Sequence, residues 1–240
     1  MNIINAGNLI MNTYVYPCAT GFVMVDTGYE HSLKDVESKL SRKGISLSEI
    51  KYVFLTHAHD DHAGFLNELL GKNADLKVIM SDMSMPTLKR GQNSFDGGCS
   101  TFLAWIFCKL MALAGKAEHR FPAIEDRYND RFIEITEDNR KYLEMILQGK
   151  ILFTPGHTKD SISLKVDNII FCGDAAMNDF PSIRRLIIWI ENLVQFEKSW
   201  DVLLSQNVDL IYPAHGRPFP ASDLAKYKEH ISKLRLYKLK

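Results

Sequence analysis

The chain has 240 residues, 46% of them hydrophobic, and its 29 basic and 29 acidic residues give a net charge of zero. This length can bury the core of one domain or of two closely packed halves, while the neutral charge disfavours a general binder of nucleic acid, which normally carries a basic excess. The four cysteines contain no CxxC pair and are typical of buried thiols in a reducing compartment: Cys18, Cys99, Cys108 and Cys172.

The first eighty residues alternate between strand and helix patterns. Short runs rich in β-branched and aromatic residues predict strands, and apolar residues at helical spacing predict helices. Ser32 is a candidate N-cap for the first helix. This order is typical of sheets covered by helices. The predicted strands are 12–16, 22–26, 52–55 and 76–80, and the predicted helices are 33–42 and 63–70.

The alternation breaks between about 81 and 147, which holds two apparent helices, a glycine-rich link at Gly97-Gly98 and a mixed polar stretch at 118–130. We interpret this segment as a helical insertion in a single domain that covers residues 1–240. Strand and helix patterns return after it. The predicted strands are 151–154, 161–166, 169–172 and 208–212, and the predicted helices are 183–205 and 223–236.

A loop dense in histidine follows the strand at 52–55 and reads Thr56-His57-Ala58-His59-Asp60-Asp61-His62. His57 and His59 alternate, so an extended backbone points both side chains the same way. Imidazole and carboxylate suit zinc, iron and manganese, and the lack of a thiol argues against a closed structural zinc site. The alternative is a polar surface loop, but ligand groups concentrate on loops at strand ends. The loop therefore predicts a metal site.

Three later strand ends each carry one further residue of the kind that binds metals. These are His157 in Pro155-Gly156-His157-Thr158, Asp174 directly after Gly173, and His215 in Pro213-Ala214-His215-Gly216. A lone histidine after a strand is more often a structural hydrogen-bonding group. Four such strand ends in one chain form a much more specific pattern.

The HxHxDH loop, followed by single His, Asp and His residues at strand ends, resembles the metallo-β-lactamase superfamily. The resemblance covers nearly the whole chain, including Val25-Asp26-Thr27-Gly28. It implies an α/β fold, a four-layer αββα sandwich with the metals at one edge of the two sheets. It also implies that Asp26 supports the histidine loop from beneath. The implied ligands are His57, His59 and His157 for a first metal, Asp61, His62 and His215 for a second, and Asp174 bridging both.

The resemblance implies two divalent metal ions as cofactors, with zinc favoured and iron or manganese as alternatives. Such a pair clamps a hydroxide and lowers the pKa of the parent water to near 7. Asp61 and Asp174 are the candidate catalytic carboxylates. The predicted function is a metal-dependent hydrolase that uses this bridged hydroxide on a carboxylic ester, thioester or lactone with an apolar part. The alternatives are a phosphodiesterase, a mononuclear-iron oxidoreductase similar to persulfide dioxygenases, and a non-catalytic binding member of the superfamily.

Comparison with known members of the superfamily limits the substrates that this chain is expected to accept. Exported β-lactamases use other residues at the position of Asp174. Glyoxalase II shares all seven ligands, but its glutathione-binding helical domain has no counterpart in the 25 residues after His215. Ribonuclease Z shares the ligands but adds RNA-handling elements that we do not find. Acyl-homoserine lactonases carry a tyrosine three residues after the bridging aspartate, where this chain has Met177. None of these specificities is therefore carried over directly.

Two apolar segments have competing interpretations. Apolar residues run along the predicted helices at 102–113 and 183–205, and they indicate either core packing, a dimer seam or a lid over the metal site. Arg184 and Arg185 follow Ser182 at the start of the second segment, where a helix dipole disfavours cations. A neighbouring carboxylate or an anionic substrate group would explain them.

The predicted partners are a small-molecule substrate and, as one alternative, a second copy of the chain in a homodimer, with no nucleic acid. The longest apolar run, 101–115, contains Lys109 and is too short to span a bilayer, so no membrane span is predicted. The first 16 residues hold no basic region of the kind that opens a secretion signal. We therefore expect a cytoplasmic protein.

Overall fold

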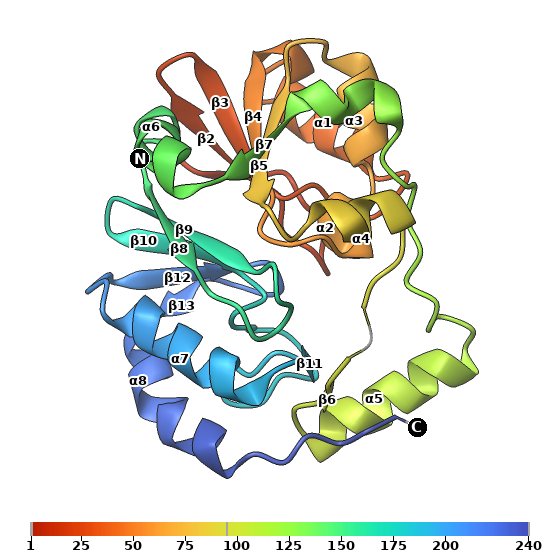
Figure 1. Ribbon diagram of the computed structural model, residues 1–240, viewed down its shortest axis with the longest axis vertical. Helices are drawn as coiled ribbons and strands as arrows, with labels where there is room; N and C mark the ends of the chain where they lie inside the picture. The colour runs from red at the N-terminus through yellow and green to blue at the C-terminus, as the bar shows by residue number, and fades with distance from the viewer. Residues whose placement is uncertain (1, 95, 240) are drawn as a thin grey trace. The chain divides into compact units, whose positions relative to one another are not determined.

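The computed structural model describes residues 2–94 and 96–239. The chain forms two compact units, which are described in turn (Figure 1). The first unit comprises the described residues up to Asn93 together with Arg120–Lys150. The second unit comprises Ser94–His119 and the described residues from Ile151 onward.

The first unit contains a six-stranded sheet in the order β1-β2-β3-β4-β5-β7. The pairs β1·β2 and β2·β3 are antiparallel, whereas β3, β4, β5 and β7 run parallel to one another. The four strands predicted in this region are confirmed, with ends that shift by up to two residues. The strands are β1 Ile4–Asn5, β2 Tyr14–Cys18, β3 Gly21–Val25, β4 Ile50–Phe54, β5 Lys77–Ser81 and β7 Phe132–Ile135.

Helices α1 and α3 supply apolar side chains to the core of the first unit. Leu33, Val36 and Leu40 of α1 belong to the same buried cluster as Leu66 of α3 and Val53 of β4. Leu33, Val36 and Leu40 follow one another at the spacing of a single helix face. The apolar pattern that predicted this helix therefore also forms part of the core. The helical segments are α1 Leu33–Ser41, η1 Leu47–Glu49, α2 Asp60–Ala63, α3 Leu66–Lys72, α4 Met85–Arg90, η2 Asp126–Arg131 and α6 Glu137–Leu147.

The helix predicted at 63–70 consists of two helices, α2 and α3, that are separated at Gly64-Phe65. The backbone passes so close to other segments at Gly64 that a Cβ atom would lie 2.4 Å from the Asp60 carbonyl oxygen and 2.4 Å from the Glu30 nitrogen. Only glycine fits at such an approach. Gly64 itself keeps helical angles, and the break falls at Phe65, whose φ and ψ are −100° and 14°.

The second unit contains a five-stranded sheet in the order β13-β12-β10-β9-β8 and a small sheet of β6 and β11. Helix α7 covers the larger sheet, because its Phe196 and Trp200 lie in one buried cluster with Ile170 of β10 and Ile211 of β12. The strands are β6 Gly98–Cys99, β8 Lys150–Phe153, β9 Ile162–Val166, β10 Ile169–Gly173, β11 Trp189–Ile190, β12 Leu210–Pro213 and β13 Phe219–Pro220, and the helices are α5 Phe102–Leu113, α7 Leu193–Leu204, α8 Ser222–Tyr227 and η3 Lys228–Lys233.

The long helix predicted at 183–205 is wrong over its first ten residues. Helix α7 begins at Leu193, capped by the side chain of Asn192, whereas Trp189 and Ile190 pair with Cys99 and Gly98 as a strand. Arg184 and Arg185 have φ angles of 59° and 64°, which lie in the left-handed region and cannot continue a right-handed helix. The helix predicted at 223–236 is also shorter, since η3 ends at Lys233.

The segment at 81–147 is divided between the two units. Residues 94–119 belong to the second unit and include the predicted apolar helix, α5. Residues 120–147 belong to the first unit, where β7 pairs in parallel with β5 and extends the sheet. Within the described residues, no helix is both long enough and apolar enough to cross a membrane.

Candidate metal centre

The histidine loop of the first unit brings its four predicted ligands together. It leaves the end of β4 and enters α2, so an extended backbone turns into a helix within six residues. The ring centroid of His57 lies 4.6 Å from that of His59 and 3.9 Å from that of His62. Asp61 Oδ1 lies 3.8 Å from His62 Nε2. The loop thus gathers three imidazoles and one carboxylate, a donor set that suits a divalent transition metal.

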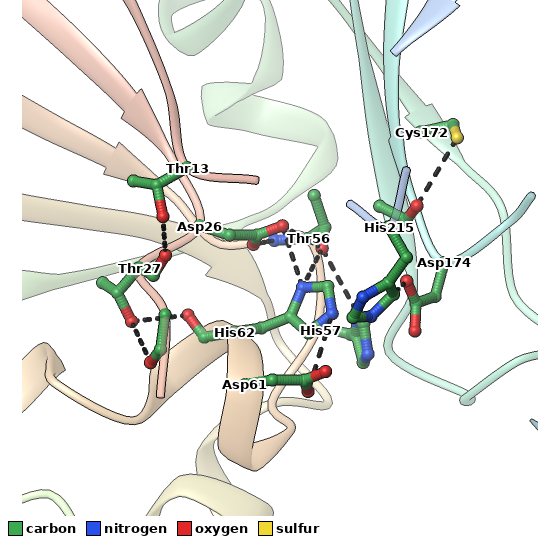
Figure 2. Close-up of polar contacts among 12 residues, drawn as sticks. Thr13, Asp26, Thr27, Thr56, His57, Asp61, His62, Cys172, Asp174 and His215 are labelled. Carbon is green, nitrogen blue, oxygen red and sulfur yellow. Dashed lines mark hydrogen bonds and ion pairs between the residues drawn. The ribbon is translucent and has the colours of Figure 1, made fainter. Parts of the chain in front are cut away.

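Asp26 supports this loop with three contacts (Figure 2). Its Oδ1 accepts the backbone N–H of Thr56 at 2.7 Å, and its Oδ2 accepts the Thr56 hydroxyl at 2.8 Å and lies 2.9 Å from His62 Nδ1. Because Nδ1 of His62 donates to a carboxylate, its Nε2 is the deprotonated nitrogen that can bind a metal. Asp26 therefore has the supporting role that the family resemblance implied.

Thr27 and Asn93 hold the backbone of the same loop. Thr27 donates both its N–H and its hydroxyl to the His62 carbonyl, at 2.8 and 2.7 Å. The Asn93 side chain accepts from the Asp60 N–H at 2.9 Å and donates to Asp60 Oδ1 at 2.7 Å. Sequence analysis missed both residues. Thr27 at least follows Asp26 in the matching motif, whereas Asn93 is 33 residues from Asp60 and carries no local signal.

In the second unit, the sheet register places Asp174 beside His215. Strands β10 and β12 are parallel, with Gly173 aligned to Pro213, so the residues that follow them leave the same edge of the sheet. Asp174 Oδ1 lies 3.5 Å from His215 Nε2 (Figure 2). Asp174 Oδ2 lies 3.3 Å from His157 Nε2. The two oxygens of one carboxylate thus face different imidazoles.

His157 is oriented by the backbone of β11. Its Nδ1 lies 2.8 Å from the Trp189 carbonyl oxygen, so Nδ1 carries the proton and Nε2 is available as the ligand atom. The loop itself is held because Glu191 N donates to the carbonyl of Gly156 at 2.9 Å. A Cβ at Gly156, whose φ is 135°, would lie 2.3 Å from Phe196 N, so this approach requires glycine. Sequence analysis missed Trp189, because the segment was predicted as a helix.

Glu191 is a further acidic residue beside this half of the ligand set. Its Oε2 accepts the N–H of Lys159 at 3.1 Å. Burial raises the pKa of the Glu191 carboxyl, and a hydrogen bond from Ser94 offsets part of this rise. Sequence analysis missed this residue, because it stands alone between two apolar segments and belongs to no motif.

A neighbouring carboxylate explains Arg185 of the arginine pair. Arg185 donates to Asp223 Oδ2 from Nε at 2.9 Å and from Nη2 at 2.7 Å, and it also donates to Asn178 Oδ1. Its guanidinium is therefore already paired within the second unit. Arg184 is exposed.

The sequence profile of the metallo-beta-lactamase superfamily matches residues 9–215. The chain belongs to the metallo-beta-lactamase superfamily. This match spans both halves of the candidate ligand set. It also bears out the resemblance that the histidine loop and the three later strand ends indicated.

Relatives and solved structures agree with this membership. The chain is 24% identical over 222 residues to the beta-lactamase-like protein 2 homolog of Caenorhabditis elegans, covering 92% of this chain and 60% of the nematode protein. It is 24% identical over 216 residues to the probable metallo-hydrolase YflN of Bacillus subtilis strain 168, covering 89% of this chain and 70% of that protein. The metallo-beta-lactamase family protein TTHA1429 from Thermus thermophilus matches with a TM-score of 0.68 at 17% identity, covering 97% and 79% of the two chains.

These comparisons confirm the α/β fold of the metallo-β-lactamase type. The chain spans about 60% of the length of the nematode relative. Each unit carries histidine and aspartate side chains that are candidate metal ligands.

Proposed function

We propose that this chain is a metal-dependent hydrolase that acts on carboxylic esters, thioesters or lactones with an apolar part. The observation that carries the proposal is the complete set of seven ligand-type side chains, with two of the histidines oriented for binding through Nε2. Superfamily membership supports the hydrolase class. The similarity to a protein named as a probable metallo-hydrolase supports it as well.

The proposal assigns each ligand to one of two metal ions. His57, His59 and His157 would hold the first ion, and Asp61, His62 and His215 would hold the second. Asp174 would contribute one oxygen to each. This assignment requires ligands from both units to share one centre, so a variant in either unit should lose metal.

The side chains assigned as ligands are of the kinds that bind divalent metal ions. Two divalent ions, zinc in our proposal, would supply a water with a pKa near 7 and a positive charge that polarises the substrate carbonyl. Asp26 keeps His62 in the tautomer whose Nε2 binds metal, and the Trp189 carbonyl does the same for His157. Asp61 and Asp174 are the carboxylates that would accept the proton of the attacking water.

The preference for an apolar carbonyl substrate rests on the loop that follows Asp174. Phe180 on this loop is 68% exposed and Ile183 is 41% exposed, and Phe107 of α5 packs edge-on against Phe180 at 6.0 Å. The apolar residues Leu186 and Ile187 are buried in the core and take no part. Because Arg185 is paired with Asp223, the support that the arginine pair gave to a phosphodiester substrate is reduced to Arg184.

A substrate comparison at equal metal loading tests the proposal. An aryl acetate, a long-chain acyl thioester, a lactone and an aryl phosphodiester should be assayed with the wild-type chain, with Asp174→Ala and with Asp201→Ala. Asp201 lies in the same unit, but its side chain pairs with Lys228. We expect turnover of at least one carbonyl substrate, lost in Asp174→Ala and kept in Asp201→Ala. A phosphodiester rate above all three carbonyl rates would overturn the substrate assignment.

A further inference from the structure

Helix α5 presents an apolar stripe to solvent. Phe102, Ile106, Leu110 and Leu113 recur at three- and four-residue spacing, which places them on one helix face. Their side chains are 56%, 37%, 60% and 85% exposed. Four large apolar side chains in one exposed row are unusual for a protein surface that only contacts water. The stripe therefore indicates an interaction surface.

The C-terminal segment, residues 234–239, lies along the same helix within the second unit (Figure 1). Tyr237 pairs with Cys99 of β6, directly before α5, and its ring lies 6.0 Å from that of Phe102. The Trp105 indole donates to the Lys238 carbonyl at 3.0 Å, and Lys109 Nζ donates to the Leu239 carbonyl at 2.8 Å. The helix and the C-terminal segment thus form one continuous surface, which we call the α5 surface.

The charge of the α5 surface is strongly one-sided, although the whole chain is neutral. Residues 102–113 include one lysine, residues 234–239 include one arginine and one lysine, and neither segment includes an acidic residue. Arg235 and Lys238 are exposed. An exposed apolar row thus lies beside basic side chains and the aromatic rings of Trp105 and Tyr237.

We propose that the α5 surface binds the surface of an anionic lipid bilayer. Apolar side chains can enter the boundary between headgroups and acyl chains, while lysine and arginine contact anionic headgroups. Tryptophan and tyrosine favour the same interfacial depth. At 12 residues, α5 is too short to span the hydrocarbon, so the helix lies in the plane of the interface.

The charge distribution favours this occupant over a second copy of the chain. In a twofold dimer built on this surface, both copies would bring basic side chains and no acidic ones into the contact, because an isologous interface uses one surface twice. The lysine and arginine charges would then find no opposite charge on the partner's copy of the surface. An anionic bilayer offers the complementary charge and also accepts the apolar stripe.

Co-sedimentation with vesicles tests the proposal. The purified chain is mixed with vesicles of phosphatidylcholine alone, or of phosphatidylcholine and phosphatidylserine at about seven to three, in low and in high salt. We expect binding to the anionic vesicles and little to the neutral ones, with a clear loss in high salt. The double variant Leu110→Glu/Leu113→Glu should reduce the partition coefficient at least about tenfold, because it removes two apolar side chains and adds two negative charges.

Matched controls separate the surface from a general effect of charge. Met145→Glu changes a side chain that is 66% exposed on α6 of the first unit, and it should bind like the wild type. Arg235→Glu/Lys238→Glu should weaken binding, whereas Arg42→Glu/Lys43→Glu, on exposed positions of the first unit, should not. Circular dichroism and thermal melting check that each variant is folded.

Three results would overturn the proposal. The first is equal binding to neutral and anionic vesicles. The second is unchanged binding of both α5-surface variants. The third is a wild-type chain that binds no vesicles but sediments as a dimer that Leu110→Glu/Leu113→Glu converts to a monomer, which would assign the surface to a second copy.

Discussion

The two halves of the candidate ligand set are built in opposite ways. In the first unit, four ligands lie within six consecutive residues, and the side chains of Asp26, Thr27 and Asn93 hold that loop from outside it. In the second unit, three ligands lie far apart in the sequence and are held by the sheet register and by the backbone carbonyl of Trp189. One half is compact and supported by side chains, and the other is dispersed and supported by the backbone.

This difference predicts which substitutions should impair metal binding in each half of the ligand set. A contiguous loop needs partners that fix its backbone and its tautomers, so substitutions outside the ligands should impair it. A dispersed set has few such side chains, and Asp174 is the residue that contacts both of its histidines. The second half should therefore lose metal mainly when Asp174 itself is substituted.

The largest expected effect is that of Asp174→Ala. It removes the carboxylate that lies between His157 and His215, so metal affinity and turnover should fall by more than the roughly 10- to 100-fold typical of losing a partner behind a ligand. Metal titration and steady-state kinetics measure the two effects. Asp201→Ala is the control in the same unit. An Asp174→Ala chain that keeps its metal content would show that this carboxylate holds neither ion.

Asp26→Asn should give the next largest effect. The amide cannot accept from both Thr56 and His62 as the carboxylate does, so the Nε2 lone pair of His62 is no longer fixed. We expect metal affinity to fall by about 10- to 100-fold, measured by competition with a chelator of known affinity. Asp75→Asn, at an exposed position on the same unit, is the control. Equal metal affinity of Asp26→Asn and the wild type would remove the proposed difference between the two halves.

Asn93→Ala should act mainly on stability. It removes two hydrogen bonds to Asp60, at 2.9 and 2.7 Å, so the free energy of unfolding should fall by about 1–2 kcal/mol. Asn93→Asp should be no better, because it keeps the acceptor for the Asp60 N–H but places a second carboxylate against Asp60. Chemical denaturation of the metal-free chain measures both. A fully stable Asn93→Asp chain would argue that the side-chain pair contributes nothing.

Substitution of Glu191 should have the smallest effect on stability, and this effect should depend on pH. Burial raises the pKa of this carboxyl in the folded chain, so its contribution to stability is present at low pH and is lost as the pH rises through the folded pKa. Glu191→Gln removes this titration. In the metal-free chain, the stability of the wild type relative to Glu191→Gln should therefore decrease from acidic to neutral pH. A difference that stays constant, or that increases with pH, would contradict the role of burial.

The sequence predicted the local structure around the histidine loop better than that around Trp189 for physical reasons. One short sequence pattern contains His57, His59, Asp61 and His62, and a continuous apolar run predicts the strand before them. Trp189 was missed because an apolar run at 186–190 has no period that distinguishes a helix from a strand. Its pairing with Cys99 is decided by a segment about ninety residues earlier in the chain. Asn93 was missed because its contact with Asp60 depends on the fold and not on neighbouring residues.

Elemental analysis of the chain tests the central claim most directly. Protein prepared without chelator and then supplied with zinc or manganese should hold close to two metal ions per chain. His59→Ala in the first unit and His215→Ala in the second should each retain about one, because each removes a ligand of a different ion. At most one ion per chain in the wild type, or a single iron that zinc does not replace, would contradict the account. So would a full pair of ions in either variant.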